Sequence, residues 1–89
     1  MEVTVERFTY IVHLENGLDI RAAGELVKEA IKCSSKVTIL NGSRHGDAKL
    51  IFNVMSLNIK KGDELEIEVI GENEKQDAAV MEKYVREHL

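Results

Sequence analysis

Residues 64–70 read Glu64-Leu65-Glu66-Ile67-Glu68-Val69-Ile70 and show the clearest periodicity in the chain. The apolar residues alternate with glutamates, and a period of two is typical of a β-strand with one buried face. The turn at residues 61–63, which contains Gly62, precedes this strand, and Gly71 ends it. We expect the glutamate face to be solvated, because charges on a strand discourage edge-to-edge association.

The rest of the chain alternates between strand and helix patterns. The expected elements are a strand over Phe8–Leu14, a helix after Asp19 with an apolar face from Ala23 to Cys33, strands at Val37–Ile39 and about Arg44–Lys49, a short helix within Leu50–Ile59, and a final helix with the stripe Ala78, Met81, Val85 and Leu89. Asn41-Gly42 predicts a hairpin. Asn73, followed by Gln76, resembles a capping box.

These elements predict an α+β fold in the order β-α-β-β-α-β-α. One four-stranded, mainly antiparallel sheet with three helices on one face buries all the apolar stripes most economically. The length of 89 residues leaves room for a single domain, residues 1–89.

Composition excludes several classes of function. The net charge of −4 and the pI of about 5.3 argue against nucleic acid as a partner. No apolar run approaches the roughly 20 residues of a membrane span, and Met1–Glu6 has no features of a secretory signal. The single cysteine, Cys33, fits a reducing compartment, so we expect a cytoplasmic location.

No catalytic or metal-binding pattern is apparent among the reactive residues. His13, His45 and His88 do not lie at metal-ligand spacing from one another, and Cys33 falls on the apolar face of the first helix. Nucleotide-binding and hydrolase motifs are absent from the sequence. We therefore expect neither an enzyme nor a bound metal or cofactor.

The segment Gly17–Ala23 leads from a turn directly into a helix N-terminus. Free N–H groups and the positive end of the helix dipole make such a terminus a natural anion site, which the Arg21 guanidinium could also reach. Asp19 is the best candidate for the N-cap, because its carboxylate can accept a backbone N–H of the first turn. An anion site and a simple helix cap both stay open on these residues.

Two segments carry a family resemblance. The first is Asn16-Gly17-Leu18-Asp19-Ile20-Arg21-Ala22-Ala23, similar to the signature G-[IL]-H-A-R-P-A; the second is Lys49-Leu50-Ile51-Phe52-Asn53-Val54-Met55-Ser56-Leu57, similar to K-S-[IL]-x-x-[VL]-M-S-L. Both resemble HPr, the phosphocarrier of the bacterial sugar phosphotransferase system. The resemblance covers nearly the whole chain and implies an HPr-like open-faced sandwich.

The chain departs from the family pattern at its phosphorylation sites. Asp19 stands where the family has the histidine that takes a phosphoryl group from enzyme I and passes it to sugar-specific acceptors. Arg21, which assists that histidine, is kept, whereas the family's alanine and proline are replaced by Ile20 and Ala22. Leu50 occupies the place of the regulatory serine of many Gram-positive relatives. The resemblance therefore implies no catalytic residue and no regulatory phosphoserine.

The expected function is that of a non-catalytic regulatory or protein-binding relative of the phosphocarrier. The surface that the family uses corresponds to Asp19, Ile20, Arg21, Phe52 and Met55. Ile51, Val54 and Met55 share one helical face, so Phe52 is expected to point toward solvent. For Met55, a place in the core and a place on the contact surface both stay open. The implied partner is enzyme I, a sugar-specific transport component or a transcriptional regulator.

Two other functions are weighed against this one. A functional phosphocarrier HPr would have to use Asp19 or a displaced histidine, of which His13 is the nearest in sequence. A binder of small anions at the helix N-terminus conflicts with the negative charge of Asp19.

Overall fold

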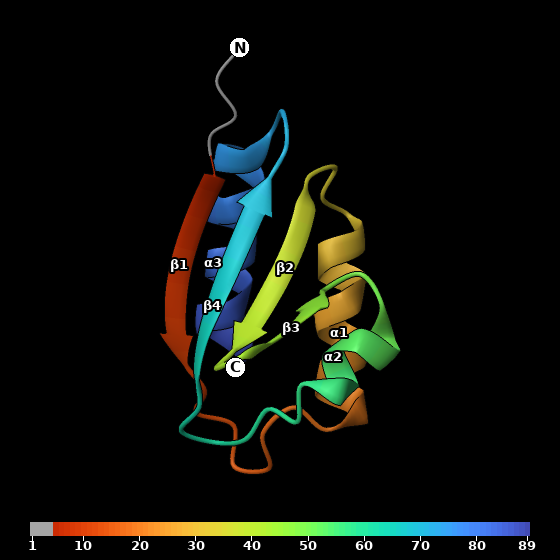
Figure 1. Cartoon of the computed structure of the whole chain (residues 1–89), viewed down its shortest axis with the longest axis vertical. Helices are drawn as coiled ribbons and strands as arrows, with labels where there is room; N and C mark the ends of the chain where they lie inside the picture. The colour runs from red at the N-terminus through yellow and green to blue at the C-terminus, as the bar shows by residue number, and fades with distance from the viewer. Residues whose placement is uncertain (1–4) are drawn as a thin grey trace.

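The computed structural model describes residues 5–89 as one sheet with helices packed against it (Figure 1). In chain order the elements are β1 (Val5–Ile11), α1 (Ile20–Ile31), β2 (Lys36–Asn41), β3 (Arg44–Asp47), α2 (Ile51–Ser56), β4 (Glu64–Ile70) and α3 (Glu74–His88). The predicted order β-α-β-β-α-β-α is confirmed.

The alternating strand β4 lies in the interior of the sheet. The strand order is β1-β4-β2-β3, and every neighbouring pair is antiparallel. Ile67 of β4 lies in register with Phe8 of β1 on one side and with Ile39 of β2 on the other. Because both of its edges are paired, β4 brings the apolar residues of its neighbours together on one face.

The helices cover this apolar face. Figure 1 shows α3 behind β1 and β4, with α1 and α2 grouped at the β3 side of the sheet. Leu26 of α1, Val54 of α2 and Met81 of α3 join Ile67 of β4 in one buried cluster. The predicted four-stranded sheet with three helices on one face is therefore confirmed.

The opposite face of β4 is open and charged. Arg7 of β1 lies across from the glutamates, with its Nε 3.8 Å from Oε1 of Glu66 and 3.5 Å from Oε1 of Glu68. Ion pairs this exposed contribute about 0–1 kcal/mol each. The glutamate face is thus a solvated surface, as predicted.

The first strand is displaced from the predicted range Phe8–Leu14. Pairing with β4 runs without a break from Val5 to Ile11. Val12 has already left the sheet, because its N–H donates to the backbone oxygen of Asp63 at 3.0 Å and its side chain turns into the core. The alternation of apolar residues thus continues past the end of the ladder, so the predicted end of the strand was wrong.

The hairpin predicted at Asn41-Gly42 forms, but its turn lies one residue later. Asn41 pairs with Arg44 in the β2–β3 ladder, which leaves Gly42 and Ser43 as the two turn residues. Gly42 has a φ of 65°, the positive angle that a type II′ turn requires at its first central position.

The capping box predicted at the start of α3 was wrong. Asn73 makes no side-chain cap, and its Nδ2 instead donates to Oγ of Ser34 at 3.3 Å. The N–H of Gly71 donates to Oε2 of Glu74 at 3.1 Å. The Asn73 side chain therefore contacts a segment 39 residues away, and the local side-chain contact at the start of α3 is made by Glu74 instead.

Candidate functional site

Gly17 holds the loop that leads into α1. Its φ is +64°, and a Cβ at this position would lie 2.3 Å from the backbone oxygen of Ile59. Leu18 is buried and donates its N–H to the same oxygen at 3.1 Å. Only glycine combines this φ with so close an approach. The start of α1 is therefore held against the segment that follows α2.

Asp19 is the N-cap of α1, as predicted. Its Oδ1 accepts the N–H of Ala22 at 2.9 Å, and its backbone oxygen accepts the N–H of Ala23 at 2.9 Å. The extended backbone of Asp19, with φ −74° and ψ 178°, is typical of an N-cap. Its carboxylate thus sits at the positive end of the helix dipole, where an anion would otherwise bind.

A surface pocket of about 410 Å³ opens beside this helix start. Asp19 at the N-cap and Arg21 of α1 line it on one side, and Tyr84 and His88 of α3 line it on the other. Arg21 is exposed and makes no ion pair with any of residues 5–89. Its guanidinium is therefore available to an anion or to a carboxylate of a partner.

The histidine in this pocket is His88, which the sequence did not suggest. His13 is nearer in the chain, but its N–H donates to the backbone oxygen of Leu89 at 2.7 Å and its ring meets Tyr10 edge-on at 5.6 Å. His45 lies exposed on β3. The only sequence signal that involves His88 is its spacing of four residues from Tyr84. On a helix this spacing predicts a contact between the two side chains, but it does not predict that they lie next to α1.

The other predicted surface residues are largely apolar and exposed. Phe52 is 84% exposed, so its predicted outward orientation is confirmed, and Ile20 is 71% exposed. Met55 is 36% exposed, because Val54 and Leu57 fill the core beneath this segment. Figure 1 shows α2 beside the N-terminal half of α1. Ile20 of α1 therefore lies on the helix next to the one that carries Phe52 and Met55.

Leu50 lies at the N-cap of α2 and makes no side-chain cap. Its side chain is 51% exposed and carries no oxygen that could cap the helix or accept a phosphoryl group. The start of α2 thus has no side-chain oxygen at position 50 that could be phosphorylated.

The remaining reactive groups do not form a second centre. Within residues 5–89, no three His, Cys, Asp or Glu side chains are grouped so that they could hold a metal ion. Cys33 is buried, and burial, followed by the nearby charge of Asp77, raises the pKa of its thiol. Such a thiol stays protonated and packs as a small apolar group, as expected.

Within residues 5–89, no helix has both the length and the apolar character needed to span a membrane.

The order of the elements and the antiparallel sheet covered by three helices define an open-faced sandwich. Residues 6–87 match the protein family described as "PTS HPr component phosphorylation site". Over 70 residues, 79% of each chain, this protein is 40% identical to the phosphocarrier protein HPr of Mycoplasma capricolum. It is 32% identical over 78 residues to the HPr-like protein Crh of Bacillus subtilis, covering 88% of this chain and 92% of Crh.

A solved structure supports the same assignment. The histidine-containing phosphocarrier protein of a mycoplasma superposes with a TM-score of 0.83 and 36% sequence identity, covering 88% of this chain and 89% of the other. The chain belongs to the HPr family of the phosphotransferase system. HPr proteins are phosphocarriers rather than enzymes, and they interact with other proteins of that system. The predicted HPr-like open-faced sandwich is confirmed.

Proposed function

We propose that this HPr-family chain is a regulatory, protein-binding relative of the phosphocarrier that accepts no phosphoryl group at the start of α1. The observation that carries the proposal is the hydrogen bond from the N–H of Ala22 to Oδ1 of Asp19 at 2.9 Å. The family signature that this segment resembles has histidine at the position of Asp19 and proline at the position of Ala22.

Both substitutions act on the same hydrogen bond. Proline has no N–H, so the family signature offers no donor at the position of Ala22. Alanine supplies that donor here, and Asp19 supplies a charged acceptor. An N-cap of this kind stabilises a helix by about 0.5–2 kcal/mol. Asp19 therefore has a structural task that the histidine of the signature does not share.

The cap also works against phosphoryl transfer. A neutral imidazole is a good nucleophile near pH 7, whereas Asp19 places a fixed negative charge where the phosphate would bind. An acyl phosphate on Asp19 would replace the carboxylate by a neutral carbonyl and weaken the charge-assisted bond from Ala22. The charge of Asp19 instead resembles, in sign, that of a permanently phosphorylated histidine.

The proposed contact surface consists of Asp19, Ile20, Arg21, Phe52 and Met55. Its support is the exposure of two large apolar side chains, Ile20 and Phe52, on adjacent helices. The exposed guanidinium of Arg21 lies on the same helix turn as Ile20. Exposed apolar groups and arginines of this kind are enriched at the energetic centres of protein interfaces.

The partner we propose is enzyme I, a sugar-specific transport component or a transcriptional regulator. The net charge of −4 favours a protein over a nucleic acid. A cytoplasmic location belongs to the same proposal, and its support is that Cys33 is a buried, free thiol.

A working phosphocarrier is the second candidate, and one observation favours it. His88 lines the same pocket as Asp19 and Arg21. In this alternative, His88 rather than the helix cap would take the phosphoryl group from enzyme I.

Intact-mass measurement after incubation with enzyme I and phosphoenolpyruvate tests the choice. We expect no phosphoryl adduct on this chain, while an HPr with its histidine is phosphorylated in the same tube. An adduct lost in His88→Gln would establish the second candidate. An adduct that survives in that variant but disappears in Asp19→Asn would show that the cap itself is phosphorylated. Co-purification with enzyme I in the same mixture measures docking separately.

A further inference from the structure

A groove runs between α1 and α3, and only its first end adjoins the contact surface proposed above, at Asp19 and Arg21. Two surface pockets, of about 410 Å³ and about 420 Å³, adjoin along it. Tyr84 and His88 line both pockets, so this pair lies where the two meet. The groove begins beside Asp19 and continues along α1 as far as Glu29.

The middle of the groove is an aromatic platform. The rings of Tyr84 and His88 lie against each other in a tilted arrangement, with a centroid separation of 4.6 Å and an interplanar angle of 32°. Tyr84 is half-buried, and Ala22 and Val80 extend the apolar lining on either side of it. A flat cationic group binds well on the face of a tyrosine ring such as Tyr84, because that face is electron-rich.

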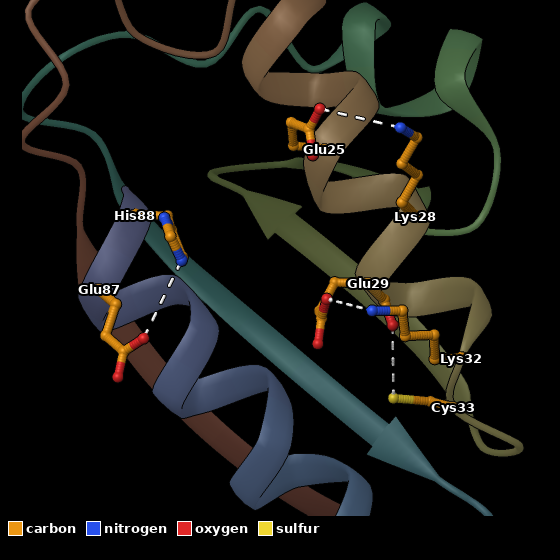
Figure 2. A network of polar contacts seen from close by, with 7 residues as sticks. All are labelled: Glu25, Lys28, Glu29, Lys32, Cys33, Glu87 and His88. Atoms are coloured by element: carbon orange, nitrogen blue, oxygen red, sulfur yellow. Dashed lines mark hydrogen bonds and ion pairs between the residues drawn. The ribbon is translucent and has the colours of Figure 1, made fainter.

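Carboxylates stand on both sides of the platform. Figure 2 shows Glu25 and Glu29 on the side of α1 that faces α3, while Lys28 and Lys32 extend to its other side. Each glutamate keeps a loose ion pair with its lysine, at 3.9 Å for Glu25 and 3.3 Å for Glu29.

The opposite wall of the groove carries a further acid. Glu87 of α3 lies 4.0 Å from the ring of His88. Burial, followed by the negative charges of Glu25 and Glu29, raises the pKa of the Tyr84 phenol. Glu25 lines the first pocket together with Tyr84, and Glu29 lines the second. Among residues 5–89, Lys83 is the only lysine or arginine that lines the second pocket, and Arg21 is the only one that lines the first.

We propose that this groove binds an arginine side chain carried on an extended segment of a partner protein. Its guanidinium would lie on the Tyr84–His88 platform and donate hydrogen bonds to the carboxylates of Glu25 and Glu29. The planar shape of guanidinium suits the face of the Tyr84 ring, and its donors suit two carboxylates one helical turn apart. This site goes beyond the proposed function, because it uses none of the five residues of the contact surface except at the mouth of the groove.

Titration of the isotopically labelled full chain with the peptide acetyl-Gly-Arg-Gly-Arg-Gly-amide, followed by NMR, tests the proposal. We expect saturable shifts centred on Glu25, Glu29, Tyr84 and His88. The double variant E25Q/E29Q should bind the peptide about tenfold more weakly. A peptide with citrulline in place of arginine should not bind, because citrulline keeps the shape but loses the charge.

The matched control is E64Q/E72Q. It removes the same amount of charge from two exposed glutamates outside the groove. An equal loss of affinity in this control would show general electrostatic attraction and overturn the proposal. Absence of saturable shifts, or shifts centred on another surface, would also overturn it. Phe52→Ala should leave peptide binding unchanged, so a failure of the contact surface and a failure of the groove are distinguishable.

Discussion

Oδ1 of Asp19 accepts the backbone N–H of Ala22 at 2.9 Å, across the first turn of α1. The family signature has neither partner of this bond, since its histidine carries no carboxylate and its proline carries no N–H. The two positions therefore depend on each other, and changes at one should alter the effect of changes at the other.

Replacing Asp19 by alanine should destabilise the protein by about 0.5–2 kcal/mol, because the N–H of Ala22 loses its acceptor. Urea denaturation at neutral pH measures this change in the free energy of unfolding. Asp19→Asn is the control: it keeps an oxygen acceptor and should be less destabilising. Equal losses in the two variants would mean that charge alone, rather than the hydrogen bond, stabilises the helix.

A double-mutant cycle between Asp19→Ala and Ala22→Pro should reveal coupling. Proline is tolerated in a first helical turn but removes the donor. In the Ala22→Pro background we expect Asp19→Ala to change the free energy of unfolding by less than about 0.5 kcal/mol. The effect should be small because residue 22 then has no N–H for the Asp19 carboxylate to accept. The same loss in both backgrounds would show that Asp19 caps another N–H in solution.

Phosphate acceptance should return more fully when both family residues are restored. Asp19→His places an imidazole beside Arg21, and adding Ala22→Pro removes a donor that has lost its partner. We expect D19H/A22P to accept more phosphoryl from enzyme I and phosphoenolpyruvate than D19H, measured by intact mass. If a genuine HPr is phosphorylated but neither variant is, the docking surface around Ile20 and Phe52 has diverged.

Phe52→Ala should separate binding from folding. Its side chain is 84% exposed, so we expect stability within about 1 kcal/mol of the unmodified protein. Capture of the native partner should weaken by about tenfold or more, equivalent to about 1.4 kcal/mol. Leu57→Ala is the contrasting variant: this side chain is buried, and its loss should cost about 2–5 kcal/mol. Thermal melts and a pull-down titration of both variants decide whether Phe52 belongs to the contact surface or to the core.

Asp77 should contribute to acid sensitivity. Burial by itself would raise the pKa of this carboxyl, but hydrogen bonding from Ser35, whose N–H lies 3.0 Å from Oδ2, lowers it below the usual value. A lowered folded-state pKa stabilises the protein above the pKa of the unfolded chain, and this stability is lost as the pH falls through the folded-state value. Asp77→Asn should therefore be less stable at neutral pH and lose less on acidification. Urea melts between neutral and acidic pH measure both effects.

Local patterns were sufficient for much of the fold. The alternation at residues 64–70 identified β4, and the helical stripe before Cys33 identified α1, because both depend on side chains that lie close together in the chain. The cap at Asp19 was predictable for the same reason, since its acceptor and donor are three residues apart. The outward orientation of Phe52 likewise follows from helical geometry alone.

Only the tertiary structure decided where those elements end and what meets across them. Val12 leaves β1, and Asn73 gives up a cap, because each finds a hydrogen-bond partner distant in the chain. His88 comes to the pocket of Asp19 through the packing of α3 beside α1. Sequence by itself determined the elements, the helix cap and the likeness to HPr, since these are local or motif-encoded. The groove between α1 and α3 required the fold, because its walls belong to two helices that are far apart in the chain and meet through tertiary packing.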